Sequence, residues 1–209
     1  MARTVIDIET VGQPLSEFEP RHHDDLIRYF DPTPQAGPPD DERRAEAVRR
    51  FSLWGPTGQV IVIGLHNPDS GQGRVLASDN EVELLEEFWG LIKGFDAHVT
   101  FNGKQFDFPF LQMRSAVHGL RPTVTLDTRR YTRHPHFDLY EILTGFYAQR
   151  RGSLDFFCSL FGIPSPKTGM KGAEVGDAYR AGRLPDIAAY CQADVEATAE
   201  LYKRVKDYF

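Results

Sequence analysis

Two carboxylic acids stand two positions apart in an apolar run near the start of the chain. Asp7 and Glu9 belong to residues 4–10, whose β-branched and apolar side chains predict a buried strand. Because side chains alternate along a strand, both acids project from the same face. Burial of one unpaired carboxylate is costly, and a second carboxylate beside it adds repulsion. Two oxygen ligands on a rigid strand therefore suit a hard divalent cation such as Mg²⁺ or Mn²⁺.

An exposed edge strand with an acidic face would give the same pattern without any ion. A third acid elsewhere in the chain therefore bears on the choice between these two interpretations. Asp107 stands between a predicted strand that begins at Val99 and Pro109, which suits the first turn of a helix. Asp107 therefore lies either at the end of a sheet strand, where α/β folds build sites, or at a helix cap satisfied by backbone amides.

The last predicted helix, from residue 185 to the end of the chain, carries a tyrosine and an aspartate on one face. Tyr190 and Asp194 are four positions apart, so they stack beside the buried stripe of that helix. Such a pair is common by chance, and it indicates a site only in combination with the other acids.

Other polar groups have more ordinary interpretations. Lys167 and Lys171 stand in a predicted loop, 165–176, where they would contact phosphates or remain solvated. His134 and His136 alternate like ligands on a strand, but no further His or Cys has ligand spacing, so zinc is not expected. Cys158 and Cys191 fall within apolar helical patterns and are expected to be buried thiols.

These candidates must be positioned by a mixed set of strands and helices. The first three strands are predicted at 4–10, 60–65 and 74–77 as an antiparallel meander, a fourth begins at 99, and a fifth is predicted at 124–127. Helices are predicted at 81–93, at 109–117, at a short segment that ends near 146, at 153–161 and from 185 onward. A charged, Pro-rich insertion at about 13–55 interrupts this pattern, with a helix expected over 40–51 and surface positions for His22 and His23.

Length and composition favour a globular protein. The chain has 209 residues, 41% of them hydrophobic, and no stretch approaches the roughly 18 apolar residues of a membrane span. We therefore expect one domain, no membrane partner and a cytoplasmic location. The net charge of −6 argues against tight binding along a long duplex, although metal ions can supply local positive charge to a nucleic-acid enzyme.

Taken in order, three motifs resemble those of the DEDD superfamily of DnaQ-like 3'-5' exonucleases. They are Asp7-Ile8-Glu9, then Asn102 with Phe106-Asp107, then Tyr190-Cys191-Gln192-Ala193-Asp194. The Tyr-x-x-x-Asp form of the third motif is similar to the tyrosine subclass. The surrounding sequence, including Ser153-Leu154-Asp155, is closer still to the exonuclease domain of family B DNA polymerases, and the resemblance spans nearly the whole chain apart from the 13–55 insertion.

The resemblance implies an α/β fold of the ribonuclease H-like type. Its sheet would be mixed and five-stranded, with the first three strands antiparallel and helices on both sides. The whole chain, 1–209, would form a single exonuclease domain. Such a fold would bring Asp194 across from Asp7 and Glu9.

The implied activity is metal-dependent removal of nucleoside 5'-monophosphates from the 3' end of single-stranded nucleic acid, with DNA favoured and RNA open. Two divalent cations, Mg²⁺ or Mn²⁺, would be held by Asp7, Glu9, Asp107 and Asp194. Tyr190 would orient the attacking water and, with the metal's help, accept its proton. Asn102 and Phe106 would contact the terminal nucleotide, Phe106 by stacking.

Two alternatives remain open from the sequence. One is a nucleic-acid-binding module that keeps the fold without turnover, which the loss of one acid would favour, yet all four acids are present. The other is a phosphohydrolase of free nucleotides or short oligoribonucleotides, which fits the net acidity. Activity as a function of chain length would separate it from an exonuclease.

Overall fold

A mixed five-stranded sheet forms the centre of the protein. The computed structural model describes residues 2–166 and 169–209. The strand order is β3-β2-β1-β4-β5. The strands are β1 (Arg3–Gly12), β2 (Gly58–His66), β3 (Gly73–Ala77), β4 (Ala97–Thr100) and β5 (His136–Asp138). β1 to β3 pair antiparallel, as the sequence predicts, whereas β4 and β5 run parallel to β1.

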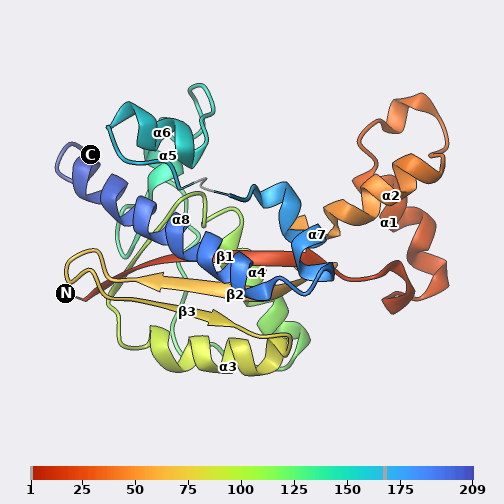
Figure 1. Cartoon of the computed structure of the whole chain (residues 1–209), viewed down its shortest axis with the longest axis horizontal. Coiled ribbons are helices and arrows are strands. Elements are labelled where there is room, and N and C mark those ends of the chain that lie inside the picture. Colours follow the sequence, from red (N-terminus) through yellow and green to blue (C-terminus); the bar gives the residue numbers. More distant parts are fainter. Residues whose placement is uncertain (1, 167–168) are drawn as a thin grey trace.

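Helices cover both faces of this sheet (Figure 1). The long helix α8 (Leu184–Val205) crosses one face, and α3 (Glu81–Ile92) and α4 (Asp107–Val117) pack on the other. Smaller helices are α5 (Leu139–Leu143), α6 (Leu154–Leu160) and α7 (Val175–Arg180). As expected, Asn80 caps α3, since its side chain accepts hydrogen bonds from the N–H groups of Val82 and Glu83.

The pleat of β1 divides its side chains between the two layers. Ile6 and Ile8 belong to the core cluster that contains α3 and α4. Val5 and Val11 belong to the clusters that contain residues of α8. Asp7 and Glu9 share the parity of Val5 and therefore face α8.

The fifth strand is not the one that the sequence predicts. Residues 124–127 form no strand, and the edge of the sheet is β5, where His136 pairs with His98. The side chain of Leu126 is buried in the core, although residue 126 belongs to no strand. The shorter β5 is selected because the carboxylate of Asp138 accepts hydrogen bonds from the N–H groups of Asn102 and Lys104, which fix it beside the end of β4.

Two other boundaries differ from expectation. The short helix α5 ends at Leu143 instead of near 146, because Gly145, Phe146 and Tyr147 all adopt positive φ angles that no α-helix contains. The segment predicted as a loop over 165–176 contains the start of α7 at Val175. Lys167 lies outside the described residues.

The 13–55 insertion forms a helical arm at one end of the molecule (Figure 1). Its helices are α1 (His23–Phe30), which the sequence did not indicate, and α2 (Asp41–Arg49), which falls within the predicted 40–51. Ile27, Phe30, Ala47 and Phe51 give the arm a small core of its own. His22 is exposed as expected, whereas His23 is partly buried, with its Nε2 2.8 Å from the carbonyl oxygen of Phe18. Among the described helices, none is both long and apolar enough to cross a bilayer.

Candidate active site

The first two acids come from the middle of β1, which lies at the centre of the sheet. Glu9 is 8% exposed and Asp7 is partly buried. Asp7 pairs with Gly64 of β2, and a Cβ atom at Gly64 would lie only 2.8 Å from Val195 Cγ1 and 2.9 Å from Cys191 Sγ. The absence of a side chain at Gly64 therefore lets α8 pack directly on the sheet beside the two acids.

The helix α8 supplies the second group. Pro185 lies in its first turn, where no backbone N–H is required. Ile187, Cys191 and Val195 form a buried stripe that packs on the sheet. Tyr190 and Asp194 flank that stripe and are partly buried, and both lie close enough to Asp7 and Glu9 to interact with them electrostatically.

Asp107 reaches the same place from α4. It is the first residue of that helix and is 3% exposed, and its Oδ1 accepts a hydrogen bond of 3.1 Å from the backbone N–H of Ile8. Its carboxylate is thus attached to β1 between Asp7 and Glu9. Asp107 is therefore not the cap of α4, whose N-cap is Phe106, and it follows the end of β4 at Thr100 instead of lying on it; its carboxylate is bound across the fold to Ile8.

The clustered acids strongly perturb one another. The pKa of Asp7 is raised well above its usual range, first by burial and then by the charges of Asp107, Glu9 and Asp194. The pKa of Glu9 is raised by burial and by Asp194 and Asp107. Burial raises the pKa of Asp107 to about 7. The charged neighbours that act on Asp7 and Glu9 are themselves carboxylates, so the cluster requires protons or cations to be stable at neutral pH.

Tyr190 belongs to the same cluster. Burial, followed by the charge of Asp194 and a hydrogen bond with it, raises the pKa of the phenol above its usual value of 10. The phenol therefore stays protonated at neutral pH and is a hydrogen-bond donor there.

Cys191 was missed as a member of this site. Its Sγ lies 3.5 Å from Asp7 Oδ2, and ligand atoms of Asp7, Glu9 and Cys191 lie within 4.8 Å of one another. The prediction of a buried thiol is correct, since Cys191 is 0% exposed. Its position between Tyr190 and Asp194 is the one sequence signal that could have placed it beside the acids.

The two expected substrate contacts occupy the loop that leads from β4 to Asp107. Asn102 is held in a left-handed conformation, with φ of 73°, and its Oδ1 is 3.5 Å from the hydroxyl of Tyr147. Phe106 is partly buried, with its ring centroid 5.6 Å from that of Phe110. Phe106 directly precedes Asp107 in the sequence, and Asn102 lies earlier in the same loop.

A buried ion pair beneath this loop was also missed. The ammonium of Lys104 pairs with the carboxylate of Glu141, and both side chains are almost fully buried. Together with Asp138, which accepts from the N–H groups of Asn102, Lys104 and Glu141, this pair fixes the path of the loop. The only available sequence signal was a lysine between Phe101 and Phe106, inside the second motif.

The remaining polar candidates lie elsewhere or have other partners. Lys171 is exposed, although a Cβ atom at the adjacent Gly172 would lie 4.0 Å from the Tyr190 hydroxyl. His134 is exposed, and the two ring nitrogens of the buried His136 lie 2.7 Å from Thr100 Oγ1 and 2.7 Å from the carbonyl oxygen of Asp127. Both ring nitrogens of His136 therefore already have hydrogen-bonding partners in the fold.

The donor set of the cluster fits hard divalent cations. Asp7, Glu9 and Asp107 offer carboxylate oxygens, whose mutual repulsion a cation would relieve. Burial, followed by the charges of Asp7 and Glu9, raises the pKa of the Cys191 thiol well above its usual range, so it remains protonated and is a poor ligand for a soft metal. The chemistry of these residues therefore suits a hard divalent cation.

Comparison with known protein families gives one match over most of the chain. Residues 60–208 match a family model described as a predicted 3'-5' exonuclease related to the exonuclease domain of PolB. That span contains Asp107, Tyr190 and Asp194, whereas Asp7 and Glu9 precede it.

Curated relatives are archaeal DNA polymerases. DNA polymerase 1 of Sulfolobus acidocaldarius is 30% identical over 122 residues, which are 52% of this chain and 14% of the polymerase. The DNA polymerase of Thermococcus hydrothermalis is 27% identical over 173 residues, which are 69% of this chain and 10% of the polymerase. The chain therefore spans only a small part of the polymerases that it matches.

The fold is found in a solved polymerase structure. The family B DNA polymerase of Pyrobaculum calidifontis aligns with 98% of this chain and 24% of its own, with a TM-score of 0.66 and 18% identity. This similarity confirms the expected fold, a mixed five-stranded sheet between helices.

Proposed function

We propose that this chain, which belongs to the family of predicted 3'-5' exonucleases related to the exonuclease domain of PolB, hydrolyses the terminal phosphodiester bond at the 3' end of single-stranded nucleic acid. The products would be nucleoside 5'-monophosphates. DNA is the favoured polymer, because the curated relatives are DNA polymerases.

The convergence of the acids carries the proposal. Three elements that are distant in sequence, β1, α4 and α8, contribute Asp7 and Glu9, Asp107, and Asp194 to one cluster. A buried carboxylate cluster without a function would be selected against, since each acid destabilises the others. Ion binding for phosphodiester hydrolysis gives that arrangement a purpose.

Two divalent cations would be held by these four acids, with Asp7 contributing to both, Glu9 and Asp194 to one and Asp107 to the other. When bound, the cations would polarise the terminal phosphate and stabilise the charge that develops on the attacking and leaving oxygens. The protein's own contribution is to present the carboxylates on a rigid strand and two helices, so that little reorganisation is required during the reaction.

Tyr190 would hold the attacking water. Its raised pKa favours a protonated phenol, which orients a water molecule by a hydrogen bond, over a phenolate that accepts the proton. Its hydrogen bond with Asp194 fixes the hydroxyl next to the acids. Asn102 and Phe106 would contact the terminal nucleotide.

The test is release of mononucleotides from single-stranded DNA and RNA labelled at the 5' end, in Mg²⁺, Mn²⁺ or chelator. A ladder that shortens from the 3' end and requires metal supports the proposal. Asp7→Asn should abolish it, whereas Asp186→Asn, a matched change of an exposed acid on α8, should leave it unchanged. Metal-independent release, or equal activity in Asp7→Asn, would refute the proposed site.

Chain length distinguishes the remaining alternatives. Hydrolysis confined to dinucleotides and trinucleotides would indicate a phosphohydrolase of short oligonucleotides. Metal-stimulated binding of single strands without release of any nucleotide would indicate a binding module.

A further inference from the structure

Exposed positive charge is concentrated on one part of this acidic protein. Residues 121–152 contain six arginines and three carboxylic acids, whereas the chain as a whole has a net charge of −6. The three acids are Asp127, Asp138 and Glu141, and all are at most 7% exposed. The arginines at 121, 129, 130, 133, 150 and 151 are all exposed. The surface of this segment is therefore basic.

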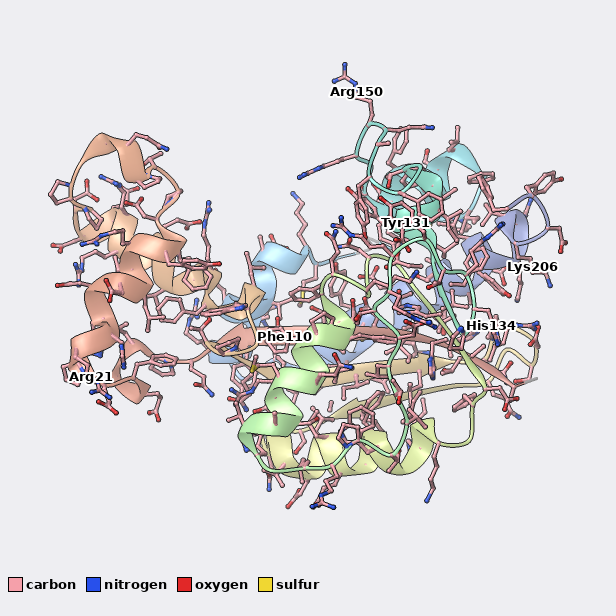
Figure 2. The ribbon with its side chains drawn as sticks, turned by 180° about the vertical axis from the view of Figure 1, so that it is seen from behind. Arg21, Phe110, Tyr131, His134, Arg150 and Lys206 are labelled. Carbon is pink, nitrogen blue, oxygen red and sulfur yellow. The ribbon has the colours of Figure 1, made fainter. Side chains whose placement is uncertain are left out.

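Aromatic rings alternate with these arginines. Tyr131 is 69% exposed, and its ring centroid lies 5.0 Å from that of Phe146. The guanidinium carbon of Arg130 lies 5.4 Å from the centre of the Tyr147 ring. Figure 2 shows Tyr131 and Arg150 on the upper side of the main body, away from the arm that carries Arg21. Basic groups with interleaved rings are typical of surfaces that bind single-stranded nucleic acid.

This surface joins the candidate active site directly. The hydroxyl of Tyr147 donates a hydrogen bond to Asn102 Oδ1 at 3.5 Å. Asn102 lies in the loop between β4 and Asp107, and it is the expected contact to the terminal nucleotide. A strand whose 3' end lies at the acids would therefore meet Tyr147 and Arg130 next.

Backbone strain is confined to the same path. Within the described chain, the non-glycine residues with positive φ are Asn102 (73°), Tyr131 (64°), Phe146 (57°) and Tyr147 (69°). Bulky aromatic residues rarely adopt this conformation, which glycine or asparagine would occupy at lower cost. Three aromatic residues in this conformation indicate that the rings are retained for a purpose other than stability.

We propose that residues 129–133 and 145–151 form a binding track for the nucleotides on the 5' side of the one that is removed. Tyr131, Phe146 and Tyr147 stack on bases, and Arg130, Arg133, Arg150 and Arg151 contact backbone phosphates. Because stacking and phosphate contacts do not read base edges, the track is sequence-independent. The inference rests on the proposed function for the position of the 3' end, but its binding step requires no hydrolysis.

The first measurement is affinity for a fluorescently labelled 12-nucleotide DNA in chelator, where hydrolysis cannot occur. We expect Arg130→Ala and Tyr131→Gly each to weaken binding about 10-fold. Arg130→Ala should also lower the slope of log affinity against log salt by about 0.7. Arg21→Ala, a change of an exposed arginine on the distant arm, is the matched control and should change neither. Equal losses in Arg21→Ala, or full affinity in both track variants, would overturn the proposal.

Tyr131→Gly separates binding from folding. Glycine accepts the positive φ of this exposed position more readily than tyrosine, so the variant should be at least as resistant to thermal unfolding as the parent. If the variant keeps its stability and binds the DNA more weakly, the lost affinity is due to the missing tyrosine ring. A loss of both would indicate a merely structural role and contradict the assignment of this residue.

Hydrolysis provides the second readout. The p-nitrophenyl ester of thymidine 5'-phosphate offers a single nucleotide and does not reach the track, so Arg130→Ala and Arg150→Ala should raise its KM much less than the KM of the 12-nucleotide DNA. The same variants should show a raised KM on the 12-nucleotide DNA. Equal loss on both substrates would overturn the track. Absence of hydrolysis by the parent would refute the proposed function instead, and the affinity measurement would still decide on the track.

Discussion

The carboxylate of Asp107 accepts a hydrogen bond from the backbone N–H of Ile8, although 99 positions separate the two residues. The bond attaches the start of α4 to the strand that carries Asp7 and Glu9. A buried N–H without a partner is costly, so this contact stabilises the fold and at the same time sets the position of an acid in the candidate site.

This double role predicts different results for two substitutions of Asp107. Asp107→Asn keeps an oxygen acceptor for the N–H of Ile8. It also removes a buried carboxyl whose pKa is raised to about 7, so the metal-free variant should be as stable as the parent or more stable. Asp107→Ala leaves that N–H unpaired and should lower the free energy of unfolding by about 1–3 kcal/mol. Both should reduce hydrolysis by about 100-fold or more. Denaturant unfolding and nucleotide release measure the two effects, and equal stabilities would contradict the role of the hydrogen bond.

Cation binding should stabilise the protein and do so through the acid cluster. The carboxylates destabilise the metal-free fold by repulsion, which a cation removes. At 100 times the dissociation constant, Mg²⁺ or Mn²⁺ should add about 2.7 kcal/mol to the free energy of unfolding. Thermal unfolding with and without metal measures this gain. Asp194→Asn should lose most of it, whereas Asp186→Asn should retain it; a gain that persists in Asp194→Asn would place the cation elsewhere.

Gly64 should control the distance between α8 and the sheet. Gly64→Ala places a Cβ atom against Val195 and Cys191, and overpacking of this kind costs about 1–3 kcal/mol. The shift of α8 should also move Asp194 away from Asp7 and reduce hydrolysis. Val195→Ala in the same chain should restore part of both properties. Gly90→Ala is the control, because a Cβ atom there meets no neighbouring atom within 4 Å; if it were as harmful as Gly64→Ala, the packing explanation would fail.

His98 should make the protein sensitive to acid. It is 4% exposed, its ring nitrogens have no hydrogen-bond partner among the described residues, and burial lowers its pKa to about 4. Between the unfolded value near 6.5 and about 4, the unfolded chain binds a proton that the folded chain excludes, so the stability due to this residue falls as the pH falls. His98→Leu should remove that loss.

The measurement for His98 is the difference in unfolding free energy between His98→Leu and the parent as a function of pH. It should grow by about 1.4 kcal/mol for each pH unit below 6.5, and level off near 4. The acids of the site titrate in both proteins, so their contribution to the pH dependence cancels in this difference. A difference that is constant from pH 7 to pH 4 would show that His98 is not the group responsible.

Much of the site could be predicted from short-range patterns. The two-residue period of a strand places Asp7 and Glu9 on one face, and the helical period places Tyr190 and Asp194 together. Helix α3 follows from its cap at Asn80 in the same way. These features depend on residues within one or two turns of each other, so the local sequence determines them.

Only the tertiary structure decided which of these surfaces meet. The apolar run 124–127 is as strand-like as 136–138, but Asp138 finds backbone partners beside β4 and takes the edge of the sheet. The hydrogen bond of Asp107 with Ile8 and the contact of Cys191 with Asp7 likewise join residues 99 and 184 positions apart. Such pairings are chosen by the competition of the whole chain for burial and hydrogen bonds, and that competition leaves no local pattern in the sequence.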